Sequence, residues 1–213
     1  MSNPMGLVLL RAMDPVASGR RAVRHRIRHW SHTVGFDDAP FPPDHRGNVL
    51  VVGAVYAGER LDGVLSCGVR RDGVNATARL AACIKQSRFY PQLHAVLLQG
   101  IAFAGFNVVD IHGLSTVLTR PVMVVVRRRP NLPAIRRALL TRVRGGARKW
   151  HLVERAGFVE EIGGVFIQRA GISADAAAAV LCRHARHGNL PEPLRTAHLI
   201  AGGVTRGESS GRP

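Results

Sequence analysis

The chain has 213 residues and a mass of 23.1 kDa, the length of one large domain, and a chain of this length buries roughly 70% of its unfolded surface on folding. Hydrophobic residues make up 46% of it, charged residues 21%, and the mean hydropathy is +0.04, which excludes a disordered, collagen-like or multi-span membrane protein. Thirty basic against 14 acidic residues give a net charge of +16, which predicts a polyanionic partner, nucleic acid before an anionic membrane surface.

The cysteines and the apolar runs bear on the location of the protein. Cys67, Cys83 and Cys182 are an odd number without a CxxC pair, which predicts neither a disulfide framework nor a zinc site and favours a reducing cytoplasm. The apolar run Met5–Leu10 is far shorter than the ~20 residues of a membrane span. We therefore expect a cytoplasmic protein without membrane contact. The acid-poor, arginine-rich start leaves an organellar transit peptide as the alternative.

The first segments are a basic arm and three strands. Residues 1–31 form a basic N-terminal arm that either lies along phosphates or is a solvated, poorly ordered terminus. Strands are expected at His32–Phe36, which ends in Asp37-Asp38, and at Val49–Tyr56 and Leu61–Val69, which a Gly-containing loop of hairpin length separates. The chain therefore opens with a three-strand meander.

Alternating helices and strands follow. Asp72 is expected to cap a helix that runs to about Gln86. The short apolar runs His94–Leu98 and Pro121–Val126 are typical of parallel strands covered on both faces. The other expected elements are a helix near Val108–Leu118, a helix at Pro133–Leu140, a basic loop at Arg142–Lys149, a strand at Val165–Gln168, a helix at Ala174–Arg186 with Ser173 as its cap, and a helix from Pro191 to about Ala201.

These elements define one α/β domain over residues 32–205, followed by a frayed tail at 206–213. A three-strand meander followed by helix-connected strands added in parallel makes a mixed sheet with helices on both faces. This order of elements predicts a ribonuclease-H-like fold.

The ends of the predicted strands carry polar residues. The first strand ends at Asp37-Asp38, the strand through Leu98 at Gln99-Gly100, and the strand through Val126 at Arg127, Arg128 and Arg129. Ligands of open α/β sheets bind at the carboxyl ends of the parallel strands. Acids and arginines should thus meet at one edge, although such an arginine run can also simply face solvent.

A cluster of carboxylates at this edge suits Mg²⁺, which prefers one or two carboxylates, waters and a phosphate oxygen. In phosphodiester cleavage the ion generates hydroxide and stabilises the developing charge, while arginines hold the phosphates. Adjacent strand residues point to opposite faces, so Asp37 and Asp38 can face one ion only if the strand is broken there, for which Pro40 is suited. The alternative is that both are solvated turn residues.

Four segments carry a resemblance to a known family: VGFDDAPF at Val34–Phe41, DGVNAT at Asp72–Thr77, LQGIAFAGFNVVDI at Leu98–Ile111, and PEPLRTAH at Pro191–His198. They resemble the endonuclease dU family, an archaeal family long described as a conserved domain of unknown function and related to endonuclease V. The match runs from about His32 to the end of the last helix. The AGFNVVD segment is highly specific.

The resemblance implies a ribonuclease-H-like fold and Mg²⁺-dependent nicking of DNA near deoxyuridine, the product of cytosine deamination, with Mn²⁺ as a substitute ion. By similarity Asp37 matches the first-strand acid that binds metal in endonuclease V, and the PEPLRTAH motif places His198 near the metal. Arg127 falls where that family has a basic residue at a strand end. Arg128 and Arg195 are further candidates for holding the DNA backbone.

One departure concerns Gln99-Gly100, which stands where endonuclease V has Asp-Gly, and an amide oxygen binds Mg²⁺ more weakly than a carboxylate. Asp72 or Asp110 can supply the missing charge, as can Asp38 if the strand is broken. Asn107 and Asp110 are three residues apart, so one helical face can present both. Catalytic candidates are therefore Asp37, Asp38, Asp72, Asp110 and His198, with Asp37 and Asp110 on the metal and Gln99 and Asn107 at the substrate.

Two other functions remain open. A protein that kept the fold and charge but lost its metal site through Gln99 would bind nucleic acid without cutting it. An inosine-directed endonuclease for RNA or DNA would differ only in its base pocket. Phe89-Tyr90 can stack on a splayed base, although aromatic residues at such a helix-to-strand junction more often belong to the core.

Overall fold

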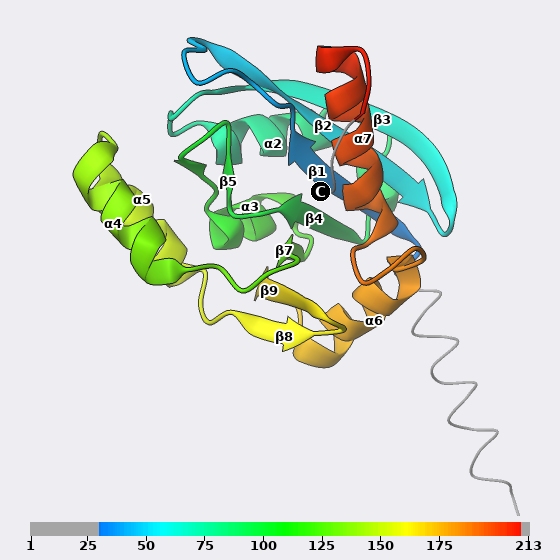
Figure 1. The fold of residues 1–213 in the computed structure, drawn as a ribbon. Coiled ribbons are helices and arrows are strands. Elements are labelled where there is room, and N and C mark those ends of the chain that lie inside the picture. The colour runs from blue at the N-terminus through cyan, green and yellow to red at the C-terminus, as the bar shows by residue number, and fades with distance from the viewer. Residues whose placement is uncertain (1–29, 210–213) are drawn as a thin grey trace, which may run out of the picture.

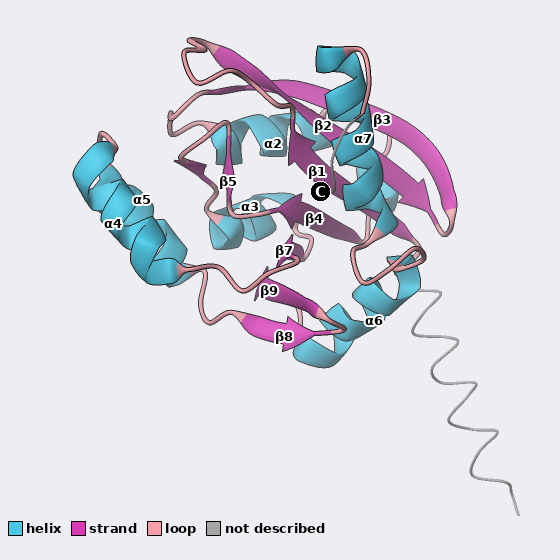
Figure 2. Ribbon diagram, in the orientation of Figure 1, coloured by secondary structure: helices cyan, strands magenta, loops and turns pink. Residues whose placement is uncertain are grey.

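The computed structural model describes residues 30–209, and the basic arm predicted for residues 1–31 lies almost wholly outside these residues. Seven strands form one sheet in the order β3-β2-β1-β4-β7-β9-β8 (Figures 1 and 2). They are β1 (His32–Asp38), β2 (Asn48–Ala57), β3 (Arg60–Arg70), β4 (Ala95–Gln99), β7 (Val122–Val126), β8 (Glu160–Ile162) and β9 (Val165–Ala170). A small ribbon of β5 (Ala102–Phe103) and β6 (Asn107–Val108) stands apart from this sheet.

The meander and the parallel strands are confirmed. β1, β2 and β3 pair antiparallel, and β4 and β7 add to β1 in parallel. The expectation that β9 also runs parallel is wrong, because it pairs antiparallel with β7. The short strand β8 was not predicted, and the positive φ angles of Gly163 (62°) and Gly164 (76°) form a tight turn that reverses the chain from β8 into β9.

Helices cover both faces of the sheet, as predicted. α2 (Ala76–Lys85) and α3 (Ile111–Leu118) pack on one face, and α6 (Ala174–His184) and α7 (Glu192–Arg206) pack on the other. Alternate residues of β4 enter the two cores, Val96 and Leu98 on the α2 side and Ala95 and Leu97 on the α7 side. This double burial explains the uninterrupted apolar runs. A short 3₁₀ helix, η1 (Tyr90–Gln92), precedes β4.

Two further helices, α4 (Leu132–Arg142) and α5 (Gly146–Arg155), form a hairpin that stands to one side of the sheet (Figure 1). They pack on the small ribbon through a separate cluster that contains Val108, Leu139 and Val153. The loop predicted at Arg142–Lys149 is therefore much shorter than expected, because only residues 143–145 separate the two helices. A Cβ atom at Gly146 would lie 1.8 Å from the Leu139 carbonyl oxygen, so the glycine that suggested a loop instead permits the close helix contact.

Two predicted helix starts also need correction. Asp72 does not cap α2, because its backbone is left-handed (φ 52°) and the helix begins only at Ala76. The helix expected from Val108 begins at Ile111, while Asn107 lies in β6. The first strand, predicted to end at Phe36, continues through Asp38 by pairing with β2. Within residues 30–209, the helices are all too short or too polar to cross a bilayer.

Candidate active site

Asp37 and His198 meet at the carboxyl end of β1. The Asp37 side chain is buried, and its Oδ2 lies 2.8 Å from Nδ1 of His198 on α7. α7 can approach β1 this closely because residue 35 is glycine: a Cβ there would lie 2.5 Å from the backbone of Pro193. His198 is one helical turn beyond Leu194, which is buried in the core against the sheet. Gly35 thus sets the depth at which His198 reaches Asp37.

Asp38 points to the other side of the strand, as the alternation of strand residues predicts. Its Oδ2 accepts a hydrogen bond from the Ala104 backbone N–H at 2.8 Å, and its own N–H donates to Oδ1 of Asp37 at 2.9 Å. Burial and the nearby Asp37 charge raise the pKa of Asp38 to about 6, against the opposing effect of the Ala104 N–H. Burial also raises the pKa of Asp37, although the His198 hydrogen bond opposes it.

Gln99 ends β4 beside these carboxylates. Because Phe36 of β1 pairs with Leu98 of β4, the next residues, Asp37 and Gln99, lie side by side on the same face. The Gln99 Oε1 atom is buried and has no hydrogen-bond partner. Buried polar atoms are nearly always paired, so an unpaired amide oxygen beside the buried Asp37 carboxylate suits a cation. We call Asp37, Asp38, Gln99 and His198 the edge cluster.

The edge cluster fits a magnesium ion that is bound partly through water. Within residues 30–209, no three His, Cys, Asp or Glu side chains converge closely enough to bind a metal by themselves. The Asp37 carboxylate and the Gln99 oxygen lie on one face and supply oxygen ligands, whereas the unbroken strand turns Asp38 to the other face, and Mg²⁺ usually keeps several waters beside one or two carboxylates. The chemistry of the donor set is therefore that of a hard cation.

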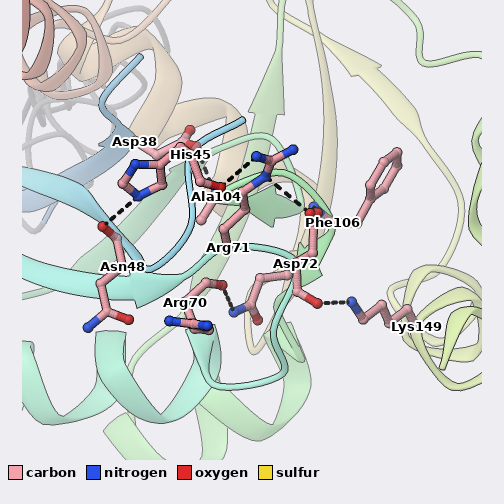
Figure 3. A network of polar contacts seen from close by, with 10 residues as sticks. Asp38, His45, Asn48, Arg70, Arg71, Asp72, Ala104, Phe106 and Lys149 are labelled. Atoms are coloured by element: carbon pink, nitrogen blue, oxygen red, sulfur yellow. Dashed lines mark hydrogen bonds and ion pairs between the residues drawn. The ribbon is translucent and has the colours of Figure 1, made fainter. Parts of the chain in front are cut away.

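Asp72 belongs to a different network (Figure 3). Its carboxylate accepts a hydrogen bond from the Phe106 backbone N–H at 2.9 Å and pairs with Arg71 at 3.2 Å. Lys149 Nζ donates to the Asp72 carbonyl oxygen at 2.6 Å, and the Asp72 N–H donates to the Ala104 carbonyl oxygen at 2.9 Å. Asp72 thus ties the β5–β6 ribbon to the β3–α2 turn, and it fixes the residue whose N–H holds Asp38.

Asn107 and Asp110 also stabilise the fold. Asn107 is fully buried; its Oδ1 accepts from the Ala76 N–H at 3.0 Å, and its Nδ2 donates to the Arg70 carbonyl and to Asn75 Oδ1, both at 2.8 Å. The expectation that Asn107 and Asp110 share a helical face is wrong. Asp110 caps α3 by accepting from Gly113 N–H, and it pairs with Arg155 of α5. No hydrogen bond or ion pair within residues 30–209 joins either to Asp37. We call Asp72, Asn107 and Asp110 the brace cluster.

The predicted arginines divide into two groups. Arg127, Arg128 and Arg129 follow β7 at the same edge and are exposed, and the Arg129 guanidinium lies 5.2 Å from the centre of the Phe166 ring. Arg195 instead binds Glu192, with Nη2 2.6 Å from Oε2. Burial alone would raise the pKa of Glu192, but the hydrogen bonds from Arg195 and His187 outweigh it and lower the pKa.

An apolar cavity that the sequence did not predict opens next to Gln99. It has a volume of about 270 Å³ and begins at Gly100, the residue after Gln99. Its walls come from β7, β9, the small ribbon and the α4–α5 hairpin, and include Phe106, Val124, Leu132, Val159 and Gln168. These residues are far apart in the sequence, so no local pattern indicates the cavity.

The sheet order and the helices on both faces define a ribonuclease-H-like fold. The structure is similar to that of a protein of unknown function from Archaeoglobus fulgidus, with 32% identity, a TM-score of 0.76 and coverage of 81% of this chain and 97% of that chain. It is also similar in fold to Endonuclease V from Bacillus subtilis, with 13% identity, a TM-score of 0.52 and coverage of 92% and 93%.

The sequence model of the family Endonuclease dU matches residues 29–205, and the chain therefore belongs to this family. A UPF0215 protein of Deinococcus radiodurans is 55% identical over 182 residues, which are 85% of this chain and 93% of that protein. The predicted resemblance and fold are confirmed. Family membership supports a nuclease that acts on DNA.

Proposed function

We propose that this protein is a Mg²⁺-dependent endodeoxyribonuclease that nicks DNA near deoxyuridine, with Mn²⁺ as a substitute ion. Beyond family membership, the observation that carries the proposal is the buried, unpaired Gln99 Oε1 beside Asp37. An oxygen without a donor, next to carboxylates whose pKa values burial has raised, is costly in a fold that serves stability alone. The cost is offset when a cation binds there.

The residues of the edge cluster have separate roles in this proposal. Asp37 and the Gln99 oxygen would hold the ion, which would supply an activated water and stabilise charge on the phosphate, while Asp38 on the other face anchors the end of the strand to the Ala104 N–H. His198 keeps the Asp37 carboxylate oriented through Nδ1, and Nε2 is the ring nitrogen that remains for exchanging a proton with water. Arg127 and Arg128, exposed beyond β7, would hold the DNA backbone.

The cavity beside Gly100 is the place for the damaged base. Enzymes that read a base inside a duplex extrude it into a pocket. A volume of about 270 Å³ with mostly apolar walls is small beside the roughly 300–1,000 Å³ of drug-sized pockets, which suits one planar base. The Gln168 side chain, bound to the Gly157 carbonyl at 2.8 Å, is a polar group in this wall.

A nicking assay tests the proposal. Labelled duplex and single-stranded oligonucleotides carrying one deoxyuridine, one deoxyinosine or neither are incubated with Mg²⁺, Mn²⁺ or EDTA. We expect cleavage that is confined to deoxyuridine, requires the ion and is lost in Asp37→Asn. Cleavage of the deoxyinosine strand instead would move the protein to an inosine-directed activity, and cleavage in EDTA would refute the metal dependence.

One observation favours a second candidate, a nucleic-acid-binding protein without catalysis. No three acidic, His or Cys ligands converge among residues 30–209, and Gln99 is uncharged. In that case every substrate is bound and none is cut with any divalent ion. The variant Gln99→Asp then separates the two candidates. If the variant nicks DNA and the wild type does not, the wild type has lost its metal site. If the wild type itself nicks DNA, the non-catalytic candidate is excluded.

A further inference from the structure

Phe158 is the most exposed of the large hydrophobic side chains within residues 30–209, with 93% of its surface accessible. It lies in the loop between α5 and β8, and the next residue, Val159, forms part of the wall of the apolar cavity. Single exposed apolar residues are common, but this one stands beside a cavity that reaches Gly100 at the edge cluster. A ligand that fills the cavity and extends out of it could therefore contact Phe158.

The backbone that carries Phe158 is firmly held. Gln168, itself buried, donates from Nε2 to the Gly157 carbonyl at 2.8 Å, and the Gly157 N–H donates to the Glu154 carbonyl at 3.1 Å. Gly157 is left-handed, with φ +88°, a conformation that favours glycine. On the other side, Glu160 pairs with Arg169 at 3.1 Å. Phe158 is thus exposed on a turn whose neighbouring residues are held by hydrogen bonds and an ion pair.

The charge around Phe158 indicates what the ring contacts. The segment from the end of β7 through β8, residues 127–162, contains ten basic and three acidic residues, Glu154, Glu160 and Glu161, and Glu160 is paired with Arg169. Such a concentration of positive charge attracts a polyanion and repels basic partners. An aromatic side chain within a positive surface is the combination that binds single-stranded or unpaired nucleic acid, because bases stack on the ring while cations hold the phosphates.

We propose that Phe158 stacks on a nucleobase of the bound DNA at the mouth of the apolar cavity. The stacked base is a neighbour of the base that the cavity holds, so the strand is kept open at the site of extrusion. The inference rests on the proposed function for its DNA partner, but it concerns binding and does not require cleavage.

The test measures binding of the full-length protein to a deoxyuridine duplex in EDTA, by fluorescence anisotropy over a range of salt concentrations. We expect Phe158→Ala to weaken binding by about 5- to 150-fold, the effect of losing one base–aromatic stack. The salt dependence should stay as in the wild type, because no phosphate contact is lost. Arg127→Ala, by contrast, should reduce the slope of log K against log salt by about 0.9.

Two further variants control the result. Phe158→Trp should retain the affinity, and its added indole emission should be quenched when DNA binds. Leu61→Ala removes another exposed apolar side chain, 42% accessible, on β3 at the opposite edge of the sheet from β8, and it should bind as the wild type does.

Wild-type affinity in Phe158→Ala, or unquenched indole in Phe158→Trp, would overturn the stacking role. If the wild type binds DNA but does not nick it, the proposed nuclease activity is refuted. The affinity of Phe158→Ala for DNA still tests the stacking role in that case. No binding by the wild type would overturn both.

Discussion

The edge cluster and the brace cluster contain the same kinds of side chain, but of the two only the edge cluster has a buried polar atom without a hydrogen-bond partner, Gln99 Oε1. In the brace cluster the carboxylates and the amide bind backbone N–H groups or arginines, as Asn107 does with three hydrogen bonds. In the edge cluster the pKa values of both carboxylates are raised by burial and the amide oxygen of Gln99 is unpaired. The comparison teaches that polar groups paired within the protein hold the fold, while the unpaired Gln99 oxygen, next to carboxylates with raised pKa values, marks the place where a ligand is expected.

The largest expected effect is the loss of nicking in Asp37→Asn. Removing a charged ligand should lower single-turnover nicking by roughly 10³-fold or more. Because the pKa of Asp37 is raised in the folded state, the charged form disfavours folding at pH 8, and the neutral amide should unfold at an equal or higher urea concentration. If the variant loses stability and still nicks DNA, Asp37 has a structural role like that of the brace-cluster residues.

Asn107→Ala should give the opposite result. It leaves the Ala76 N–H and the Arg70 carbonyl without their buried partner, which should cost about 3 kcal/mol in urea unfolding. Nicking by the folded fraction should stay within a few-fold of the wild type. Asn131→Ala is the control, since it removes one exposed cap of α4 and should cost about 1 kcal/mol. Equal losses in the two variants would contradict the role of Asn107.

A buried histidine, His184, extends the comparison to pH. Burial, with a contribution from Arg183, lowers the pKa of His184 to about 4, against the hydrogen bond to the Trp30 carbonyl. The stabilisation by neutral His184 is therefore complete above pH 6.5 and is lost as the pH falls toward 4, by up to about 3 kcal/mol. The free energy of unfolding of the wild type relative to His184→Gln, measured from pH 8 to 4, should show this loss. A constant difference would refute it.

The smallest effect is expected for Asp110→Ala. Loss of the α3 cap and of a partly exposed pair with Arg155 should cost about 1 kcal/mol and lower Tm by about 2–4 °C, with nicking unchanged. Asp110 was a predicted metal ligand, so this variant also tests that prediction. A loss of nicking as large as that of Asp37→Asn would return Asp110 to the catalytic residues.

The sequence predicted what depends on local periodicity. Continuous apolar runs indicated β4 and β7, and Ser173 caps α6 as expected. The polar edge was predicted from strand ends alone, and the contact of Asp37 with His198 agrees with the position that the family resemblance implies for His198. Residues whose role depends on long-range contacts were not assigned correctly. Asp72 has the sequence of a helix cap, but the Phe106 N–H and Lys149 hold it in a left-handed turn.

The apolar cavity and Phe158 had no local signal for the same reason. The aromatic pair that the sequence singled out, Phe89-Tyr90, packs against the core, where the Tyr90 hydroxyl donates to the Leu118 carbonyl at 2.7 Å. Phe158 is exposed, and the Gly157 beside it is fixed by Gln168 from a later strand. Burial depends on the folded chain. It distinguishes the exposed Phe158 from Phe89 and Tyr90, which pack against the core, whereas the sequence around these residues does not.

The contact between Asp37 and His198 joins residues that are 161 positions apart. A ribosome must therefore make nearly the whole chain before the two can meet, and contacts of this span form late and slowly. An interrupted product that lacks α7 would contain both carboxylates and most of the arginines but no assembled edge cluster. The order of synthesis thus keeps incomplete chains from assembling the edge cluster before the rest of the domain is made.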